Sequence, residues 1–376
     1  MKILFVCRGL TRKTPGAESA AYNWYNELLK YNHDIYTLTD YSENLVSKNQ
    51  YFYINRFKLI SKLHGINFFI ENFLAKKKIQ LLHKIFRFDL IIVHGYAGFY
   101  PEPPKNANSL ICSHDIIDYS VYNNLNFGIF NLFEFLWYYV AKRIRLGVIK
   151  KYRYYHAIST SISESYKRYG IKKENIIISL NGVNLNRNIK LPCAKISRIN
   201  IISIIGSIEY RKGIDLAISI MKYLPINYKL FIVGSNSFIS RDYLNYLQKE
   251  IKKSTKHKEI FFLGYQKNIT KIFEKTNILI STSRAEACQL VPLEAIGNNI
   301  PVIMTKTGAA LDLISKGLPI IIIDMFDDPK QIASKILRIE GKKLEKKSEN
   351  LALEYFFWQK RVEEFNIFIE EKLNRF

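Results

Sequence analysis

The chain has 376 residues, which is too long for one ordinary domain and about right for two. Apolar residues make up 48% and charged residues 24%, which is ordinary for a folded soluble protein rather than a disordered one. The net charge of +23 indicates attraction to an anionic partner, such as a nucleotide, an acidic phospholipid surface or nucleic acid. A general bias toward lysine explains the charge equally well.

The four cysteines, Cys7, Cys112, Cys193 and Cys288, are widely separated and form no Cys-x-x-Cys pair and no Cys/His metal spacing. A zinc site is therefore not expected, and free thiols in a reducing cytoplasm are. The apolar start, Met1 to Cys7, is too short for a signal peptide, and no stretch of about 18 uncharged apolar residues occurs. We expect a protein without a transmembrane helix, in the cytoplasm or on the cytosolic face of a membrane.

The amino-terminal half alternates strand and helix patterns. Lys2–Cys7 has the pattern of a buried strand, the segment after Glu18 has helical periodicity, and Asp34–Thr39 has the pattern of a second strand. Further strand patterns follow at 89–94 and 109–114. This β-α-β order predicts a parallel, doubly wound sheet.

Two positions in this half lie where such a sheet binds its ligands. Gly16 ends the loop before the first helix pattern, and His114 follows directly after a strand pattern. Open parallel sheets bind ligands outside the carboxyl ends of their strands. Gly16 could equally belong to an ordinary turn, and His114 could be a surface histidine that caps a loop.

Two basic, apolar-rich stretches, 56–87 and 126–155, have features of membrane-surface helices. The first carries the lysine run Lys76–Lys78, and the second is aromatic at its start and basic toward its end. Such helices can lie on an anionic bilayer. They can also be ordinary domain helices with a solvated face, and the sequence leaves both interpretations open.

The carboxy-terminal half repeats the alternation after a polar and basic linker predicted at about 186–197. A strand pattern ends at Gly206, and Ser207 and a basic turn precede a helix pattern at 214–224. The turn contains Arg211 and Lys212. Because positive side chains at a helix start are unfavourable for the helix dipole, these two residues require an anion beside them.

The stretch Ser283–Asn299 follows another buried strand pattern and leads into a helix whose first residue is predicted to be Pro292. The amides of Gln289, Leu290 and Val291 then have no helical acceptor, which makes the helix start an anion site. Two carboxylates bracket this loop, Glu286 and Glu294. For Glu294 alone, a favourable interaction with the helix dipole is a sufficient explanation.

Taken together, these motifs resemble glycosyltransferases of family four, which have the GT-B fold and are described as glycosyl transferases group 1. The stretch Ser283–Asn299 is similar to their donor-binding signature, and Gly206 to Gly213 is similar to their Gly-Arg-x-x-x-x-Lys-Gly element. Asn181 to Asn184 is similar to the end of their first domain. The sequence departs from the family pattern in the first loop, at the diphosphate arginine and after the first glutamate, where it has Pro15, Ser207 and 287–289.

The resemblance implies an α/β protein with two Rossmann-like doubly wound parallel-sheet domains that face a central cleft. Residues 1–190 are expected to form the acceptor-binding domain and residues 191–355 the nucleotide-sugar-binding domain. Residues 356–376 are expected to form a final helix that crosses back to the first domain.

The resemblance also implies roles for individual residues. Glu286, His114 and Lys212 are the expected catalytic residues, with Glu286 and His114 facing the transferred sugar. Donor binding is assigned to Gly206, Ser207, Arg211, Lys212, Gln289, Leu290, Val291 and Glu294, of which Glu294 holds the ribose. Gly16 and Asn181 are assigned to the acceptor side or to a loop at the cleft.

The implied reaction moves a sugar, with retention of configuration, from a nucleotide diphosphate sugar to a hydroxyl of a glycan or lipid-linked acceptor. No Asp-x-Asp pair is present to hold a metal, so neither a metal nor a cofactor is expected. An anionic membrane surface is a further partner, and no motif for nucleic-acid binding is present. Three alternatives stay open: a membrane-associated lipid glycosyltransferase, another GT-B activity such as sugar-phosphate synthesis, and a non-catalytic binding protein of the same fold.

Overall fold

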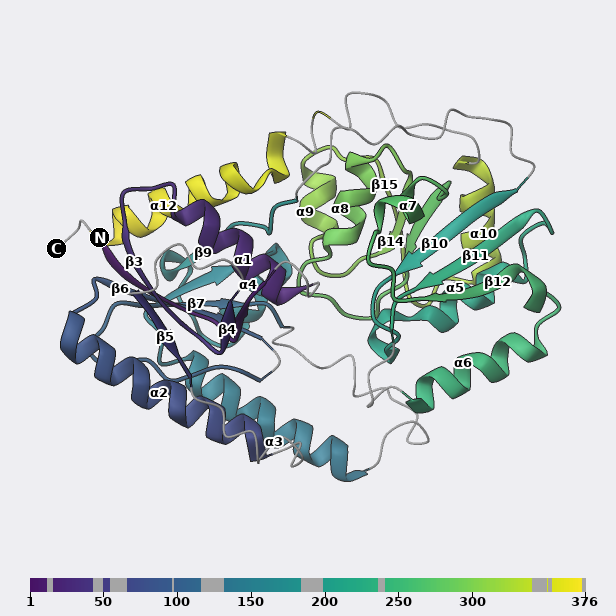
Figure 1. Ribbon diagram of the computed structural model, residues 1–376. Helices are drawn as coiled ribbons and strands as arrows, with labels where there is room; N and C mark the ends of the chain where they lie inside the picture. Colours follow the sequence, from purple (N-terminus) through teal and green to yellow (C-terminus); the bar gives the residue numbers. More distant parts are fainter. Residues whose placement is uncertain are drawn as a thin grey trace. The chain divides into compact units, whose positions relative to one another are not determined.

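The computed structural model describes residues 1–11, 16–42, 50–54, 66–96, 98–115, 132–183, 199–235, 241–339, 350 and 354–373. Within these residues the chain divides into two compact units (Figure 1). The first unit contains the chain up to Gly182 and the last helix, which starts at Trp358. The second unit runs from Val183 to Phe357. The predicted linker lies outside the described residues, and the predicted domain borders stay predictions.

The described part of the first unit is built on a seven-stranded sheet in the order β5-β3-β1-β6-β7-β8-β9. Each pair of neighbouring strands in it is parallel. The strands are β1 (Lys2–Val6), β3 (Asp34–Thr39), β5 (Tyr51–Tyr53), β6 (Leu90–Gly95), β7 (Ser109–Ser113), β8 (Tyr154–Ala157) and β9 (Ile176–Ile178). Two short strands, β2 (Gly9–Leu10) and β4 (Tyr41–Ser42), pair separately.

One face of this sheet packs against α1 (Ala17–Leu28) and α12 (Trp358–Leu373), which lie side by side (Figure 1). Trp24 of α1 is 1% exposed and contacts Trp358 and Phe365 of α12 in edge-to-face geometry. Its indole Nε1 donates to Oδ1 of Asn181 at 3.0 Å. A buried indole N–H requires an acceptor, so Asn181 allows this aromatic cluster to form.

Three further helices belong to the first unit: α2 (Ile66–Phe86), α3 (Leu132–Ile149) and α4 (Thr160–Arg168). The stretch predicted as one long helix at 126–155 therefore ends at Ile149, and Tyr154 is already in β8. Its residues before Leu132, and residues 56–65 of the other basic stretch, lie outside the described part of the chain. Among the described helices, none has the length and apolar character needed to cross a membrane.

The second unit contains a six-stranded parallel sheet in its described residues, in the order β12-β11-β10-β13-β14-β15. Its strands are rich in isoleucine and form one core with the flanking helices, as expected for a parallel sheet covered on both faces. The strands are β10 (Asn200–Ile205), β11 (Tyr228–Val233), β12 (Ile260–Gly264), β13 (Ile278–Ser281), β14 (Val302–Thr305) and β15 (Ile320–Ile323). The helices are α5 (Ile214–Met221), α6 (Arg241–Lys253), α7 (Thr270–Phe273), α8 (Leu290–Gly297), α9 (Ala310–Ser315) and α10 (Pro329–Ile339).

The predicted α/β class with two parallel sheets is confirmed. The predicted strands at 2–7, 34–39, 89–94 and 109–114, and the one that ends at Gly206, correspond to β1, β3, β6, β7 and β10 with ends within one residue, because buried apolar runs end at turn residues.

Candidate functional site

A buried carboxylate, Glu286, lies at the centre of a charged cluster in the second unit. It belongs to the loop between β13 and α8 and is 9% exposed. Oε1 accepts hydrogen bonds from Nζ of Lys212 at 2.6 Å and from Oγ of Ser283 at 2.9 Å. Oε2 accepts one from Nη1 of Arg211 at 2.8 Å. Burial by itself raises the pKa of Glu286, but the charges of Lys212 and Arg211 and these hydrogen bonds lower it to about 2.

The two cations lie on a tight turn that a glycine fixes in place. Tyr210–Lys212 form a single 3-10 turn, and Gly213 follows with φ of 61°. A Cβ at Gly213 would lie 2.0 Å from the carbonyl oxygen of Thr282, so no larger residue fits. Oγ1 of Thr282 also donates to the Gly213 carbonyl at 2.8 Å. The turn is therefore held against the end of β13, and the anion that the sequence requires beside Arg211 and Lys212 is the chain's own Glu286.

Arg284 fastens the same loop to α5. Its guanidinium donates to both carboxylate oxygens of Asp215, at 2.8 and 2.6 Å, and to the carbonyl of Tyr210 at 2.7 Å. It also lies 3.9 Å from the centroid of the Tyr210 ring. This bidentate pair with a stacked ring sets the position of the turn that carries Arg211. The sequence analysis gave Arg284 and Asp215 no role, because their pairing depends on contact between distant segments.

Helix α8 begins two residues earlier than predicted. Leu290 is its first residue and Gln289 its N-cap, so Pro292 occupies the third helical position. The prediction that Pro292 starts the helix is wrong, because proline is tolerated wherever the first turn leaves an N–H without an acceptor. The amides of Leu290 and Val291 still lie in that first turn and point out of the helix start, as predicted.

The side chain of Gln289 is buried, and only one of its two polar atoms has a hydrogen-bond partner among the described residues. Its Nε2 donates to Oγ1 of Thr307 at 2.8 Å, whereas its Oε1 has no hydrogen-bond partner within the described part of the chain. The loop before α9 approaches closely here: a Cβ on Gly308, which has φ of 55°, would lie 2.8 Å from Oε1 and 3.0 Å from Cβ of Glu286. Thr307 and Gly308 therefore line the same site, although the sequence analysis assigned them no role.

Glu294, one turn into α8, has the opposite environment from Glu286. Protein atoms surround its carboxylate, although part of the side chain remains accessible. Burial raises the pKa of Glu294 to about 7, and among the described residues no cation or hydrogen-bond donor offsets this effect. A half-buried carboxylate without a partner is costly in the free protein and can accept donors from a ligand.

The end of β10 completes the group. Gly206 donates its N–H to the Val233 carbonyl, and a Cβ on Gly206 would lie 3.1 Å from Cε of Lys212. The lysine side chain thus passes directly over Gly206, and Ser207 follows, partly exposed. The second unit brings together Gly206, Arg211, Lys212, Glu286 and Gln289, with the start of α8 following directly in the chain.

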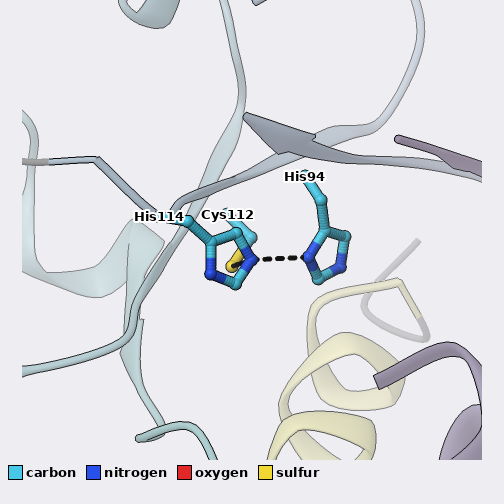
Figure 2. Close-up of side chains that lie close together, drawn as sticks. All are labelled: His94, Cys112 and His114. Carbon is cyan, nitrogen blue, oxygen red and sulfur yellow. Dashed lines mark hydrogen bonds between the residues drawn. The ribbon is translucent and has the colours of Figure 1, made fainter. Parts of the chain in front are cut away.

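His114 lies in the first unit, just past β7. Its backbone N–H donates to the Gly95 carbonyl at 2.9 Å, and its Nε2 is 2.8 Å from Nδ1 of His94 (Figure 2). Burial and the nearby His156 lower the pKa of His114 to about 3, and burial and both neighbouring histidines lower the pKa of His94 well below its ordinary value. Both imidazoles are neutral at physiological pH. His114 can therefore exchange hydrogen bonds with a ligand but brings no positive charge.

Gly16 and Asn181 also lie in the first unit. Gly16 precedes α1 with φ of 93°, and a Cβ there would meet nothing within 4 Å, so backbone conformation rather than space favours glycine. The side chain of Asn181 is buried and accepts the hydrogen bond from Trp24 described above. Their assignment to the acceptor side stays a prediction.

Comparison with known proteins shows that part of the chain is similar to glycosyltransferases. Residues 193–353 match the family model described as Glycosyl transferases group 1. The chain is 27% identical over 184 residues to a probable sucrose-phosphate synthase of Thermosipho melanesiensis, a match that covers 47% of this chain and 43% of that relative. It is 24% identical over 277 residues to the capsular polysaccharide biosynthesis glycosyltransferase CapM of Staphylococcus aureus, covering 62% and 70% of the two chains. The match to the sucrose-phosphate synthase thus spans less than half of that protein's length.

Among solved structures, the chain is similar to Anabaena Alr3699/HepE in complex with UDP and glucose, with a TM-score of 0.71 and 15% sequence identity. This similarity covers 99% of this chain and 100% of the Anabaena chain. The fold is therefore the GT-B fold of glycosyltransferases. Residues 193–353 match the glycosyl transferases group 1 family model, and the rest of the chain lies outside that match.

The charge of Glu286 makes stability depend on pH. Its pKa of about 2 lies below the ordinary value of 4.5, so its contribution is complete above pH 4.5 and is lost as pH falls toward 2. We expect Glu286→Gln to lower the unfolding free energy by about 3 kcal/mol near neutral pH, and the difference from wild type to shrink steadily in acid. Urea unfolding at a series of pH values measures this difference. The control is Glu250→Gln, which removes a surface pair with Lys253 and should cost less than about 1 kcal/mol; a pH-independent loss at Glu286 contradicts the ionic explanation.

Proposed function

We propose that this protein transfers a sugar from a nucleoside diphosphate sugar to a hydroxyl group of a glycan or lipid-linked acceptor. The observation that carries the proposal is the convergence of Arg211 and Lys212 on Glu286, in the loop that leads into α8. The match of residues 193–353 to the glycosyl transferases group 1 family model supports it. The UDP and glucose in the similar Anabaena structure, and the part that CapM has in capsular polysaccharide biosynthesis, indicate the classes of donor and acceptor.

In this proposal the donor diphosphate binds beside the amides of Leu290 and Val291 and the two cations. Phosphate oxygens are stronger partners for lysine and arginine than one shared carboxylate, and a helix start favours negative charge. Glu294 accepts hydrogen bonds from the ribose hydroxyls, which supplies the partner that its carboxylate lacks. Oε1 of Gln289, which has no hydrogen-bond partner among the described residues, accepts a hydrogen bond from a hydroxyl group of the transferred sugar.

Bond cleavage places negative charge on the departing diphosphate. Lys212, Arg211 and the α8 amides are fixed positive groups that stabilise this charge, so their contribution is electrostatic. Glu286 is a poor covalent nucleophile, because both of its oxygens already accept hydrogen bonds and its pKa is about 2. These properties support retention by attack on the same face of the sugar rather than through a glycosyl-enzyme intermediate. Transfer without a metal is proposed from the family resemblance alone.

From the same resemblance we assign His114 to the transferred sugar, and Gly16 and Asn181 to the acceptor side or to a loop at the cleft. His114 is partly exposed at the carboxyl end of β7 and is neutral, so it can donate to or accept from a sugar hydroxyl. Gly16 shapes the loop before α1. Asn181 acts indirectly, because its side chain holds Trp24.

We further propose that α2 and α3 contact an anionic membrane surface, where a lipid-linked acceptor is found. Both helices line a groove of about 150 Å³, to which α2 contributes Phe69 and Phe73 and α3 contributes Ile144. Phe73 is 57% exposed, and Lys77 lies 5.6 Å from its ring centroid. Exposed apolar side chains among lysines match the chemistry of an acidic bilayer surface.

Nucleotide binding tests the proposed function. We expect UDP and UDP-glucose, within a panel of nucleotides and nucleotide sugars, to raise the unfolding temperature, because a ligand bound only by the folded state stabilises it by about 2.7 kcal/mol at 100 times its Kd. Lys212→Ala and Glu294→Ala should lose this shift. The matched controls Lys222→Ala and Glu274→Ala change exposed residues of the same unit and should keep it.

Two outcomes contradict the enzyme proposal. If no nucleotide in the panel shifts the unfolding temperature, the donor site is absent. If a nucleotide binds but a sugar acceptor never increases the release of free nucleotide diphosphate from the donor, the protein is a binding protein of this fold. Ser207, in place of the family's arginine, is the feature that favours this second function.

Donor affinity should also depend on pH through Glu294. Ribose hydroxyls donate to the ionised carboxylate, whose pKa in the free protein is about 7. Binding therefore releases a proton below neutral pH. The affinity for UDP-glucose, whose doubly esterified diphosphate does not titrate in this range, should rise by up to about tenfold per unit from about pH 5 to 7 and level off above. Isothermal titration calorimetry in buffers of different ionisation enthalpy measures both affinity and proton release. In Glu294→Gln the pH dependence should disappear; an unchanged dependence excludes Glu294 as its source.

Vesicle binding tests the membrane surface. We expect the protein to sediment with phosphatidylglycerol-containing vesicles at low salt, and not with pure phosphatidylcholine, because the attraction is electrostatic and screened by salt. Phe73→Ser combined with Lys77→Glu should reduce binding severalfold. Phe326→Ser is the control, since Phe326 is 89% exposed in the second unit. Equal loss in both variants, or equal binding to both vesicle types, contradicts a surface on α2 and α3.

A further inference from the structure

Three side chains that can ligate a metal meet at the carboxyl ends of β6 and β7: His94, Cys112 and His114 (Figure 2). His94 lies directly beside Cys112 in the register of these parallel strands, and His114 follows Cys112 by two residues. Neighbours in register, and residues two apart along an extended chain, project from the same face of a sheet. The backbone hydrogen bond from His114 to Gly95 continues the strand pairing past Ser113, so all three side chains converge.

The distances fit the coordination shell of a small transition-metal ion. All three ligand atoms lie within 4.8 Å of one another. Nδ1 of His94 is 2.8 Å, and Sγ of Cys112 is 3.4 Å, from Nε2 of His114. With zinc–nitrogen bonds of about 2.0–2.1 Å and zinc–sulfur bonds of about 2.3 Å, tetrahedral ligand atoms lie roughly 3.3–3.6 Å apart. The distance from the Cys112 sulfur to His114 already falls in this range, and separating the rings by about 0.5 Å brings the two nitrogens into it. The Cys112 sulfur and the His94 nitrogen lie within 4.8 Å of one another and approach to complete the coordination shell.

Both ring nitrogens face the same point in space. In their hydrogen bond one nitrogen donates a proton and the other accepts it through its lone pair. A metal ion can accept lone pairs from both rings once the proton of the donating nitrogen has moved to the other nitrogen of the same ring, which keeps that imidazole neutral. The thiol of Cys112 then binds as thiolate and releases its own proton to solvent.

We propose that His94, Cys112 and His114 bind one transition-metal ion of the zinc class. Two imidazoles and one thiolate suit zinc and cobalt, whereas magnesium and calcium prefer oxygen ligands. Three protein ligands leave a fourth coordination position open for water or another small ligand.

Two of the three ligands are buried, which makes the site rigid, and the third is partly exposed, which gives an ion access to it. His94 is 2% exposed and Cys112 is fully buried, and Phe5 packs on the His94 ring with centroids 4.6 Å apart. These two ligands are therefore held in place by the core. His114 is partly exposed, so an ion can enter from its side. The cysteine and histidine spacing led us to expect no zinc site, because the ligands of this group come from two strands and the Cys-x-His pair alone supplies only two of them.

Metal binding has a consequence for activity that rests on the proposed function. A metal on Nε2 of His114 holds the ring in place and leaves its proton on Nδ1, so His114 can no longer accept a hydrogen bond from the transferred sugar. Zinc should therefore inhibit transfer, to an extent set by its occupancy of this site. The metal site itself is formed by residues at the ends of β6 and β7. Metal binding therefore tests it independently of the reaction that the protein catalyses.

Cobalt titration tests the site. Chelator-treated full-length protein should bind one cobalt ion per chain, with a near-ultraviolet thiolate-to-cobalt charge-transfer band and the intense visible bands of four-coordinate cobalt, and zinc should displace it. Cys112→Ser should lose the charge-transfer band. His114→Ala, a change at a partly exposed residue, should weaken zinc binding at least about tenfold. Cys7→Ser and Cys288→Ser are matched controls and should bind as wild type does.

The proposal is overturned if the band survives in Cys112→Ser, if a control cysteine variant loses it equally, or if cobalt fails to bind. Circular dichroism of each variant shows that it is folded, and His114→Ala provides an independent answer if Cys112→Ser is not. Zinc inhibition is then measured relative to each variant's own metal-free rate. Binding without inhibition leaves the metal site in place and contradicts the proposed role of His114.

Discussion

The buried charge of Glu286 is the constraint on which the candidate site depends. Removing an isolated carboxylate from water costs several kcal/mol, and two cations and a hydroxyl offset that cost here. To make these contacts, the turn after β10 and the loop after β13 must lie side by side. Gly213 allows the close approach, and the Arg284–Asp215 pair keeps it. The ionic cluster thus joins segments that are far apart in the chain into one surface at the carboxyl edge of the sheet.

Two glutamates close together in the sequence show how environment divides one residue type into two functions. Glu286 is surrounded by positive charge and has a pKa of about 2, whereas Glu294 is surrounded by protein atoms without a partner and has a pKa of about 7. The first is a fixed negative charge that positions cations. The second is a poised acceptor whose protonation state can follow ligand binding. Such divergence within one site is typical of functional carboxylates.

In the first unit, too, side chains gather at the carboxyl ends of neighbouring parallel strands, but they are histidines and a cysteine rather than charged residues. Because register places His94 next to Cys112, side chains at the ends of neighbouring strands gather into one cluster. This group contains two neutral imidazoles and a thiol, and its histidine pKa values are lowered by burial and by neighbouring histidines. The same architecture therefore forms a cluster of charged side chains in one unit and a cluster of imidazole nitrogens and a thiol in the other.

The sequence by itself determined the α/β class and most strand positions, because buried apolar runs bounded by glycine and polar turns have few other solutions. It also marked Arg211, Lys212 and Glu294, since the effect of a charge at a helix start is known without the fold, and it marked Glu286 through the resemblance to the family's donor-binding signature. It placed the start of α8 two residues late, because proline fits anywhere in a first turn. Only the tertiary structure decided that Glu286 neutralises Arg211 and Lys212, that Arg284 pairs with Asp215, and that His94 meets Cys112. Each of these contacts joins residues on different strands or loops, and register and loop approach are properties of the folded chain rather than of any local pattern.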